Sequence, residues 1–102
     1  MKVTKHAKNR IKDRIGGKKG NATRIAELAL ERGIPHSETK GRLNKWITSE
    51  WAFNKTANNI RLYRGKAFIF RGTTLITVLN IPNSLMKDLD KMIKQRKENG
   101  DD

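Results

Sequence analysis

Three side chains near the start of the chain have the types and the spacing to bind and activate a phosphate group. His6, Arg10 and Arg14 follow one another at intervals of four residues, which places them in one line along a helix. A guanidinium group binds phosphate through charge-assisted hydrogen bonds, and an imidazole exchanges protons near neutral pH. This row therefore predicts a phosphate-binding surface, with His6 as general acid or base and Arg10 stabilising charge on the phosphate.

The segment that carries this row is predicted to be an amphipathic helix. Thr4 is its expected N-cap, and the pair Gly16-Gly17 is its expected end. One apolar stripe is formed by Val3, Ala7, Ile11 and Ile15, and the opposite face carries Lys5, Lys8 and Lys12. The histidine and the two arginines lie at the edge of the apolar stripe, so we expect their side chains to be held in place against the core.

The charge of the chain indicates a polyanionic partner. Lys and Arg number 23 against 10 Asp and Glu, a net charge of +13, and eight of the 23 bases fall within the first nineteen residues. A folded surface this basic attracts nucleic acid, and counterion release makes such binding strongly dependent on salt. We expect nucleic acid as the partner, with RNA ahead of DNA, and a ribosome, a ribonucleoprotein or an antitoxin protein as further candidates.

Composition also excludes several classes of protein. There is no cysteine, so the chain has no disulfide framework and no thiolate metal site. His36 lacks a neighbouring ligand at metal-site spacing, and we expect neither a metal nor a cofactor. No apolar run approaches the length of a membrane span or of a signal peptide, so we expect a cytoplasmic protein without membrane contact.

Further candidate residues lie outside the first helix. Besides Arg10 and Arg14, the predicted nucleic-acid contacts are Lys18, Lys19, Arg61, Arg64 and Arg71. Tyr63 is predicted to stack on a base or orient the substrate, and it completes a candidate catalytic set with His6 and Arg10. Each has a structural alternative, because arginines also pair with acids such as Asp13 and tyrosine is a common strand residue.

The rest of the sequence predicts an α+β fold. Asn21 and Ser37 are expected to cap two further helices, the second with Leu43, Trp46, Ile47 and Trp51 in its core-facing stripe. The period then changes to two, which predicts strands at 59–63, 66–71 and 74–81 joined by two-residue turns at Arg64-Gly65 and Gly72-Thr73. A final helix is expected after Pro82, capped by Asn83 or Ser84.

We therefore expect one domain at residues 1–97, with 98–102 as a frayed acidic tail. In this domain, N-terminal helices pack on a three-stranded antiparallel meander that is followed by a C-terminal helix. The helices are expected to cover one face of the sheet. The other face would then expose Arg61 and Tyr63, together with one of the two alternating sets of the second strand. Alternation alone does not decide which set that is. Thr77, which alternates with Leu75 and Leu79, either faces a cleft or satisfies strand preference.

The order of elements resembles that of the RelE/ParE-like toxin superfamily of small ribonuclease folds. The opening Thr4-Lys5-His6-Ala7 with Arg10 and Arg14 is similar to the opening of small proteins grouped with that set, and residues 75–79, LITVL, are similar to their closing strand. The resemblance implies metal-independent RNA cleavage by attack of a 2′-hydroxyl. It also implies that Tyr63, Arg61 and Arg71 occupy sheet positions of the site.

Three functions follow from these observations. The first is a small RNA-binding protein that acts as a RelE-like endoribonuclease. The second is a non-catalytic inhibitor of the phage or mobile-element type that docks on a guide-RNA or ribonucleoprotein complex. The third is a DNA-binding regulator with a helix-turn-helix, for which the joint at 16–20 is long and the second helix is apolar on the side that would read a groove.

Overall fold

The computed structural model describes residues 1–16, 21–53 and 57–98. In chain order the elements are β1 (Lys2–Val3), α1 (Lys5–Arg14), α2 (Asn21–Arg32), β2 (Ile34–Pro35), η1 (His36–Glu38), α3 (Gly41–Phe53), β3 (Asn59–Tyr63), β4 (Lys66–Arg71), β5 (Thr74–Asn80), η2 (Asn83–Leu85) and α4 (Met86–Glu98). Within these ranges, none of the helices has the length and hydropathy needed to cross a bilayer. The α+β class predicted from the sequence is confirmed.

The sheet is larger than the predicted meander. It has five strands in the order β1-β5-β4-β3-β2, with β1 parallel to β5 and the other pairs antiparallel. The central strands β3, β4 and β5 form the expected meander, although β5 ends at Asn80 rather than at residue 81. The two added strands have two residues each, so they carry no alternation that a sequence pattern could detect.

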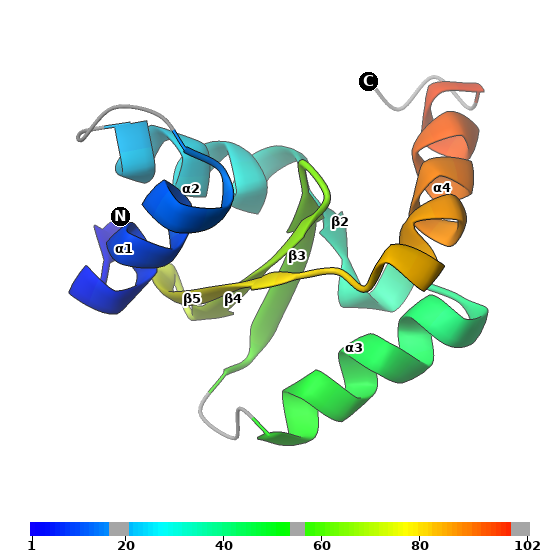
Figure 1. Cartoon of the computed structure of the whole chain (residues 1–102), viewed down its shortest axis with the longest axis horizontal. Helices are drawn as coiled ribbons and strands as arrows, with labels where there is room; N and C mark the ends of the chain where they lie inside the picture. Colours follow the sequence, from blue (N-terminus) through cyan, green and yellow to red (C-terminus); the bar gives the residue numbers. More distant parts are fainter. Residues whose placement is uncertain (17–20, 54–56, 99–102) are drawn as a thin grey trace.

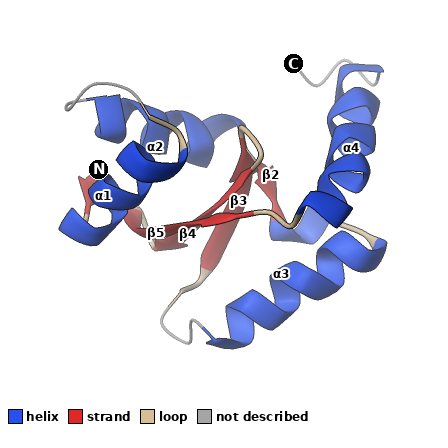
Figure 2. Cartoon of the chain, viewed as in Figure 1, coloured by secondary structure: helices blue, strands red, loops and turns tan. Residues whose placement is uncertain are grey.

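Helices cover both faces of the sheet, and the prediction of a single covered face was wrong (Figures 1 and 2). On one face, α1 and α2 enclose a core that includes Phe68, Phe70, Leu75 and Val78. On the other, α3 and α4 enclose a core that includes Ile60, Leu62, Ala67 and Ile69. Neither alternating set of β4 faces solvent along its length, because adjacent residues of this strand belong to different cores.

The first helix forms as its sequence predicts. The Thr4 side chain accepts a hydrogen bond from the backbone N–H of Ala7 at 3.1 Å, which satisfies one of the free donors of the first turn. The helix ends at Arg14, and Gly16 follows with a φ of 81°, a conformation that glycine adopts without strain. Ala7 and Ile11 are buried, so one face of α1 is fixed against the sheet.

The third helix begins later than predicted. Ser37 lies inside η1 and does not cap α3, which starts at Gly41. The Thr39 hydroxyl donates to the backbone carbonyl of His36 at 2.6 Å and accepts from the Asn44 amide at 2.9 Å. Trp46 packs against the core under α3 and α4 as expected, whereas the side chain of Trp51 lies outside the described residues.

Replacing Gly33 by alanine is expected to destabilise the junction between α2 and β2. A Cβ at this position would lie 2.4 Å from the Ala29 carbonyl oxygen and 2.9 Å from the Arg61 Cβ, and backbone atoms cannot move aside cheaply. We expect the free energy of unfolding to fall by about 1–3 kcal/mol, measured by urea denaturation. The exposed Ser37→Ala serves as control, and equal stability of the two variants would contradict this packing.

Candidate nucleic-acid interface

The start of α1 is attached directly to the edge of β5. The backbone N–H of Thr4 donates to the Leu75 carbonyl at 3.1 Å, and the Thr4 hydroxyl donates to the Ile76 carbonyl at 3.3 Å. Strand β1 pairs with β5 only at Thr74 and Leu75, so no described strand pairs with the remainder of β5 on that side. The first turn of α1 therefore lies beside an open stretch of sheet edge.

An imidazole, a guanidinium group and a hydroxyl meet at this edge. The Nε2 atom of His6 lies 3.1 Å from the Thr77 hydroxyl oxygen, and the Nε of Arg10 donates to the same Nε2 at 3.4 Å. His6 is exposed and the other two side chains are half-buried, so the cluster is accessible while two of its members are held by packing. We call His6, Arg10 and Thr77 the edge cluster.

The Nε2 atom of His6 is the atom that both other members of the edge cluster contact. A guanidinium group has donors and no acceptor, so the Nε2 of His6 must accept from Arg10. The Thr77 hydroxyl oxygen lies within hydrogen-bond distance of the same Nε2. A phosphate that Arg10 binds would therefore lie beside the imidazole.

The second arginine of the row has no ion-pair partner among the described residues. Arg14 is half-buried, its Nε atom is buried, and no described residue hydrogen-bonds that atom. Within the described part of the chain neither Arg10 nor Arg14 forms an ion pair with a carboxylate, Asp13 included. The structural alternative, in which these arginines serve to bind internal acids, is therefore absent from the described residues.

The outer face of α1 differs from its arginine row. Lys5, Lys8 and Lys12 are exposed, as the helical spacing predicts. Their charge adds to the attraction of a polyanion without fixed geometry, whereas the arginines present donors that packing holds in place. Lys18 and Lys19, the next predicted contacts, lie outside the described residues.

The structure separates the cations of the sheet from one another. Tyr63 lies opposite Lys66 at one end of β4, and Arg71 lies opposite Thr74 at the other end, roughly 17 Å away at ordinary strand geometry. Arg71 is exposed. Of the residues predicted at the hairpins, Tyr63 and Arg64 therefore lie at one end of β4 and Arg71 lies at the other.

Tyr63 does not join the edge cluster. It packs against the core under α1 and α2, with its ring 6.1 Å from that of Phe68 in an edge-to-face arrangement. Two strands and three residues separate it from Thr77, roughly 14 Å by strand spacings. The structure therefore brings together two of the three predicted catalytic residues, His6 and Arg10, and Thr77 lies where the third was expected.

The remaining two arginines hold different positions. Arg61 is half-buried on the face covered by α1 and α2, and its Nε donates to the Asn59 side chain at 3.1 Å, which corrects the prediction of an open face. Arg64 is exposed, lies 5.6 Å from the centre of the Tyr63 ring, and has a φ of 51°. With Gly65 also at positive φ, this is the backbone of a type I′ turn, in which arginine replaces the favoured asparagine or glycine.

Comparison with known proteins adds no relative. No known protein family, no curated protein and no solved structure matches this chain. The interface is therefore interpreted from the geometry of the edge cluster and from the lack of a carboxylate partner for Arg10 and Arg14 among the described residues.

Proposed function

We propose that this protein binds RNA through the arginine row of α1 and the adjacent edge of β5. The observation that carries the proposal is that Arg10 and Arg14 are positioned by packing and are paired with no carboxylate among the described residues. A guanidinium group without a carboxylate partner can use its remaining N–H donors, other than Nε, for phosphate oxygens. The net charge of +13 supplies the long-range attraction.

Binding is tested with a single-stranded RNA by fluorescence anisotropy over a series of salt concentrations. The proposal expects affinity to fall linearly on a logarithmic plot, with a slope of about −0.7 for each phosphate contacted. A duplex DNA of equal length serves as the comparison, and we expect weaker retention of the duplex. If the single-stranded RNA and the duplex DNA bind equally at every salt concentration, the protein attracts nucleic acid through net charge alone and the proposal is wrong.

The edge cluster supports a second step, RNA cleavage. In this reaction the Nε2 of His6 takes the proton of a ribose 2′-hydroxyl, and O2′ forms a bond to the adjacent phosphorus. The bond from phosphorus to the 5′-oxygen then breaks, that oxygen takes a proton from water, and the hydroxide so formed removes the proton from His6. Arg10, whose Nε lies 3.4 Å from the Nε2 of His6, stabilises the negative charge that accumulates on the phosphate. The products are a 2′,3′-cyclic phosphate and a 5′-hydroxyl end.

His6→Ala is expected to lower the rate of cleavage by about 100-fold or more, which is the usual effect of removing a general base. RNA affinity should change little, because phosphate is held by the arginines. The measurement is single-turnover cleavage of a labelled RNA in the presence of a chelator. His36→Ala is the matched control, because His36 is the second histidine of the chain and bonds Thr48 away from this edge.

The outcome separates the two parts of the proposal. If wild-type protein binds the RNA and leaves it intact, the cleavage step is wrong and the protein is a binding module. An inhibitor that docks on a ribonucleoprotein then becomes the better account.

A further inference from the structure

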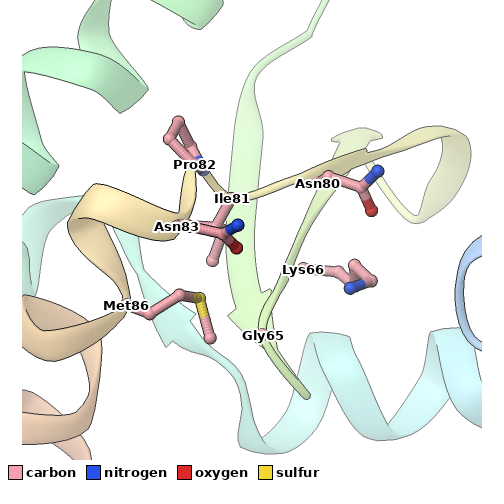
Figure 3. A pocket seen from close by; sticks show the side chains of 7 residues that line it. All are labelled: Gly65, Lys66, Asn80, Ile81, Pro82, Asn83 and Met86. Atoms are coloured by element: carbon pink, nitrogen blue, oxygen red, sulfur yellow. The ribbon is translucent and has the colours of Figure 1, made fainter.

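A hollow of about 450 Å³ lies at the corner where the β3–β4 turn meets the start of α4. Its polar lining consists of Lys66, Asn80 and Asn83, and its apolar lining of Ile81, Pro82 and Met86. Figure 3 shows Asn83 and Met86 on one side, with Lys66 and Asn80 across from them. None of the RNA-binding residues predicted from the sequence lines this hollow, although Arg64 adjoins it in the chain.

The polar groups of the hollow have no partners among the residues that the structure describes. In the described ranges no residue hydrogen-bonds the side-chain amide of Asn80 or of Asn83, and Lys66 forms no ion pair. Each amide offers two donor hydrogens and a carbonyl acceptor, which is the chemistry that pairs with the edge of a nucleobase. Lys66 offers a point charge for a phosphate.

The apolar groups give the hollow a surface for a flat ring. The Met86 side chain reaches the turn, where a Cβ on Gly65 would lie 3.2 Å from the methionine Cε. Glycine at this position therefore allows the methionine methyl group to pack directly against the turn. Pro82 and Met86, which are half-buried, present an apolar wall that can contact the face of a base.

The hollow is close to the interface already described. Asn80 and Thr77 are three residues apart on β5, about 10 Å along the strand. Thr77 lies opposite Ile69 of β4, and Asn80 lies opposite Lys66 at the end of the same pair of strands. One continuous RNA strand can thus contact the edge cluster with its phosphates and reach the hollow with a base.

We infer that the hollow binds an unpaired base of the RNA, with Asn80 and Asn83 reading its edge and Lys66 contacting the adjoining phosphate. The inference rests on the proposed RNA binding and extends it, since the arginine row recognises phosphate alone. It gives the protein a preference for base-bearing single strands. Adenine is the first base to test, because an asparagine amide pairs with it through two hydrogen bonds.

The test compares two strands that carry the same number of phosphates. One is a short oligoadenylate, and the other is an abasic strand of equal length with the same backbone. Wild-type protein should bind the oligoadenylate about tenfold more tightly, the usual size of one base contact. The double variant Asn80→Ala, Asn83→Ala should bind both strands equally, with the affinity of wild type for the abasic strand.

Gln95→Ala is the matched control, because it removes an exposed amide from α4 away from the hollow, and it should keep the wild-type preference. A preference that persists in the double variant, or that is missing from wild type while both strands still bind, overturns the inference and leaves RNA binding intact. Failure of wild type to bind either strand overturns the proposed function and the inference with it.

A second measurement does not depend on variants. Adenosine 5′-monophosphate is titrated into wild-type protein and followed by backbone amide shifts in NMR spectra. Shifts at Gly65, Asn80 and Asn83 are expected, and shifts confined to α1 would contradict occupation of the hollow.

Discussion

Replacing Arg10 and Arg14 together by alanine is expected to weaken binding of single-stranded RNA by at least about 100-fold, because each charge-assisted contact contributes roughly 1.5–3 kcal/mol. The salt dependence should change as well. Loss of two phosphate contacts lowers the slope of log affinity against log salt by about 1.4 for a single strand. Both quantities come from one set of anisotropy titrations.

The matched control for this variant is Lys8→Ala with Lys12→Ala. It removes the same charge from the same helix, but from the exposed outer face. We expect it to weaken binding by only a few-fold, since exposed lysines contribute through the general field of the molecule. Equal losses in the two double variants would show that net charge alone determines affinity, and the positioned row would have no special role.

Phe70→Ala and Ile69→Ala are each expected to lower the free energy of unfolding by several kcal/mol, although the two residues are adjacent in β4. Both side chains are fully buried, Phe70 under α1 and α2 and Ile69 under α3 and α4. Truncation of a core phenylalanine costs about 3–5 kcal/mol and of a core isoleucine about 2–5 kcal/mol. Urea denaturation monitored by tryptophan fluorescence measures both.

The neighbouring Arg71→Ala is the control, because this side chain is exposed at the end of the same strand and its loss should change stability by less than about 0.5 kcal/mol. A sheet covered on one face would tolerate one of the two core truncations. A loss below about 1 kcal/mol for either variant would therefore contradict the arrangement of helices on both faces.

The parts of the fold that the sequence predicts well are those governed by local rules. Thr4 caps α1 because its side chain can reach the free N–H groups of the first turn. The β3–β4 turn follows from Gly65, which adopts positive φ without strain in the two-residue gap between two strand-like segments. The bounds of β3 and β4 match the predicted ranges for the same reason.

The second layer of helices depends on packing between segments far apart in the chain. A signal for it does exist in β4, where residues 67–70, AFIF, form a continuous apolar run of the kind found in strands buried on both faces. Strict alternation was the wrong rule for this strand. In β5 the register also shifts near its start, where Phe70 lies opposite Leu75 and Ile69 opposite Thr77.

The candidate site likewise combines contacts that local spacing predicts with contacts between distant segments. The contact between His6 and Arg10 follows from their spacing of four residues on one helix. Thr77 is 71 residues from His6, and only the attachment of α1 to the open edge of β5 brings them together. The hollow beside Asn80 and Asn83 likewise depends on how the chain turns from β5 into α4, which no local pattern encodes.

The most direct test of the central claim is to map the RNA contact surface by NMR. A short single-stranded RNA is titrated into the labelled protein, and the backbone amides are followed at moderate salt. The account predicts that the largest shifts fall between residues 6 and 14 of α1 and around Thr77 of β5. If the chemical shifts of those amides do not change, while shifts occur on α3 or the exposed face of α4, the arginine row of α1 does not hold the RNA.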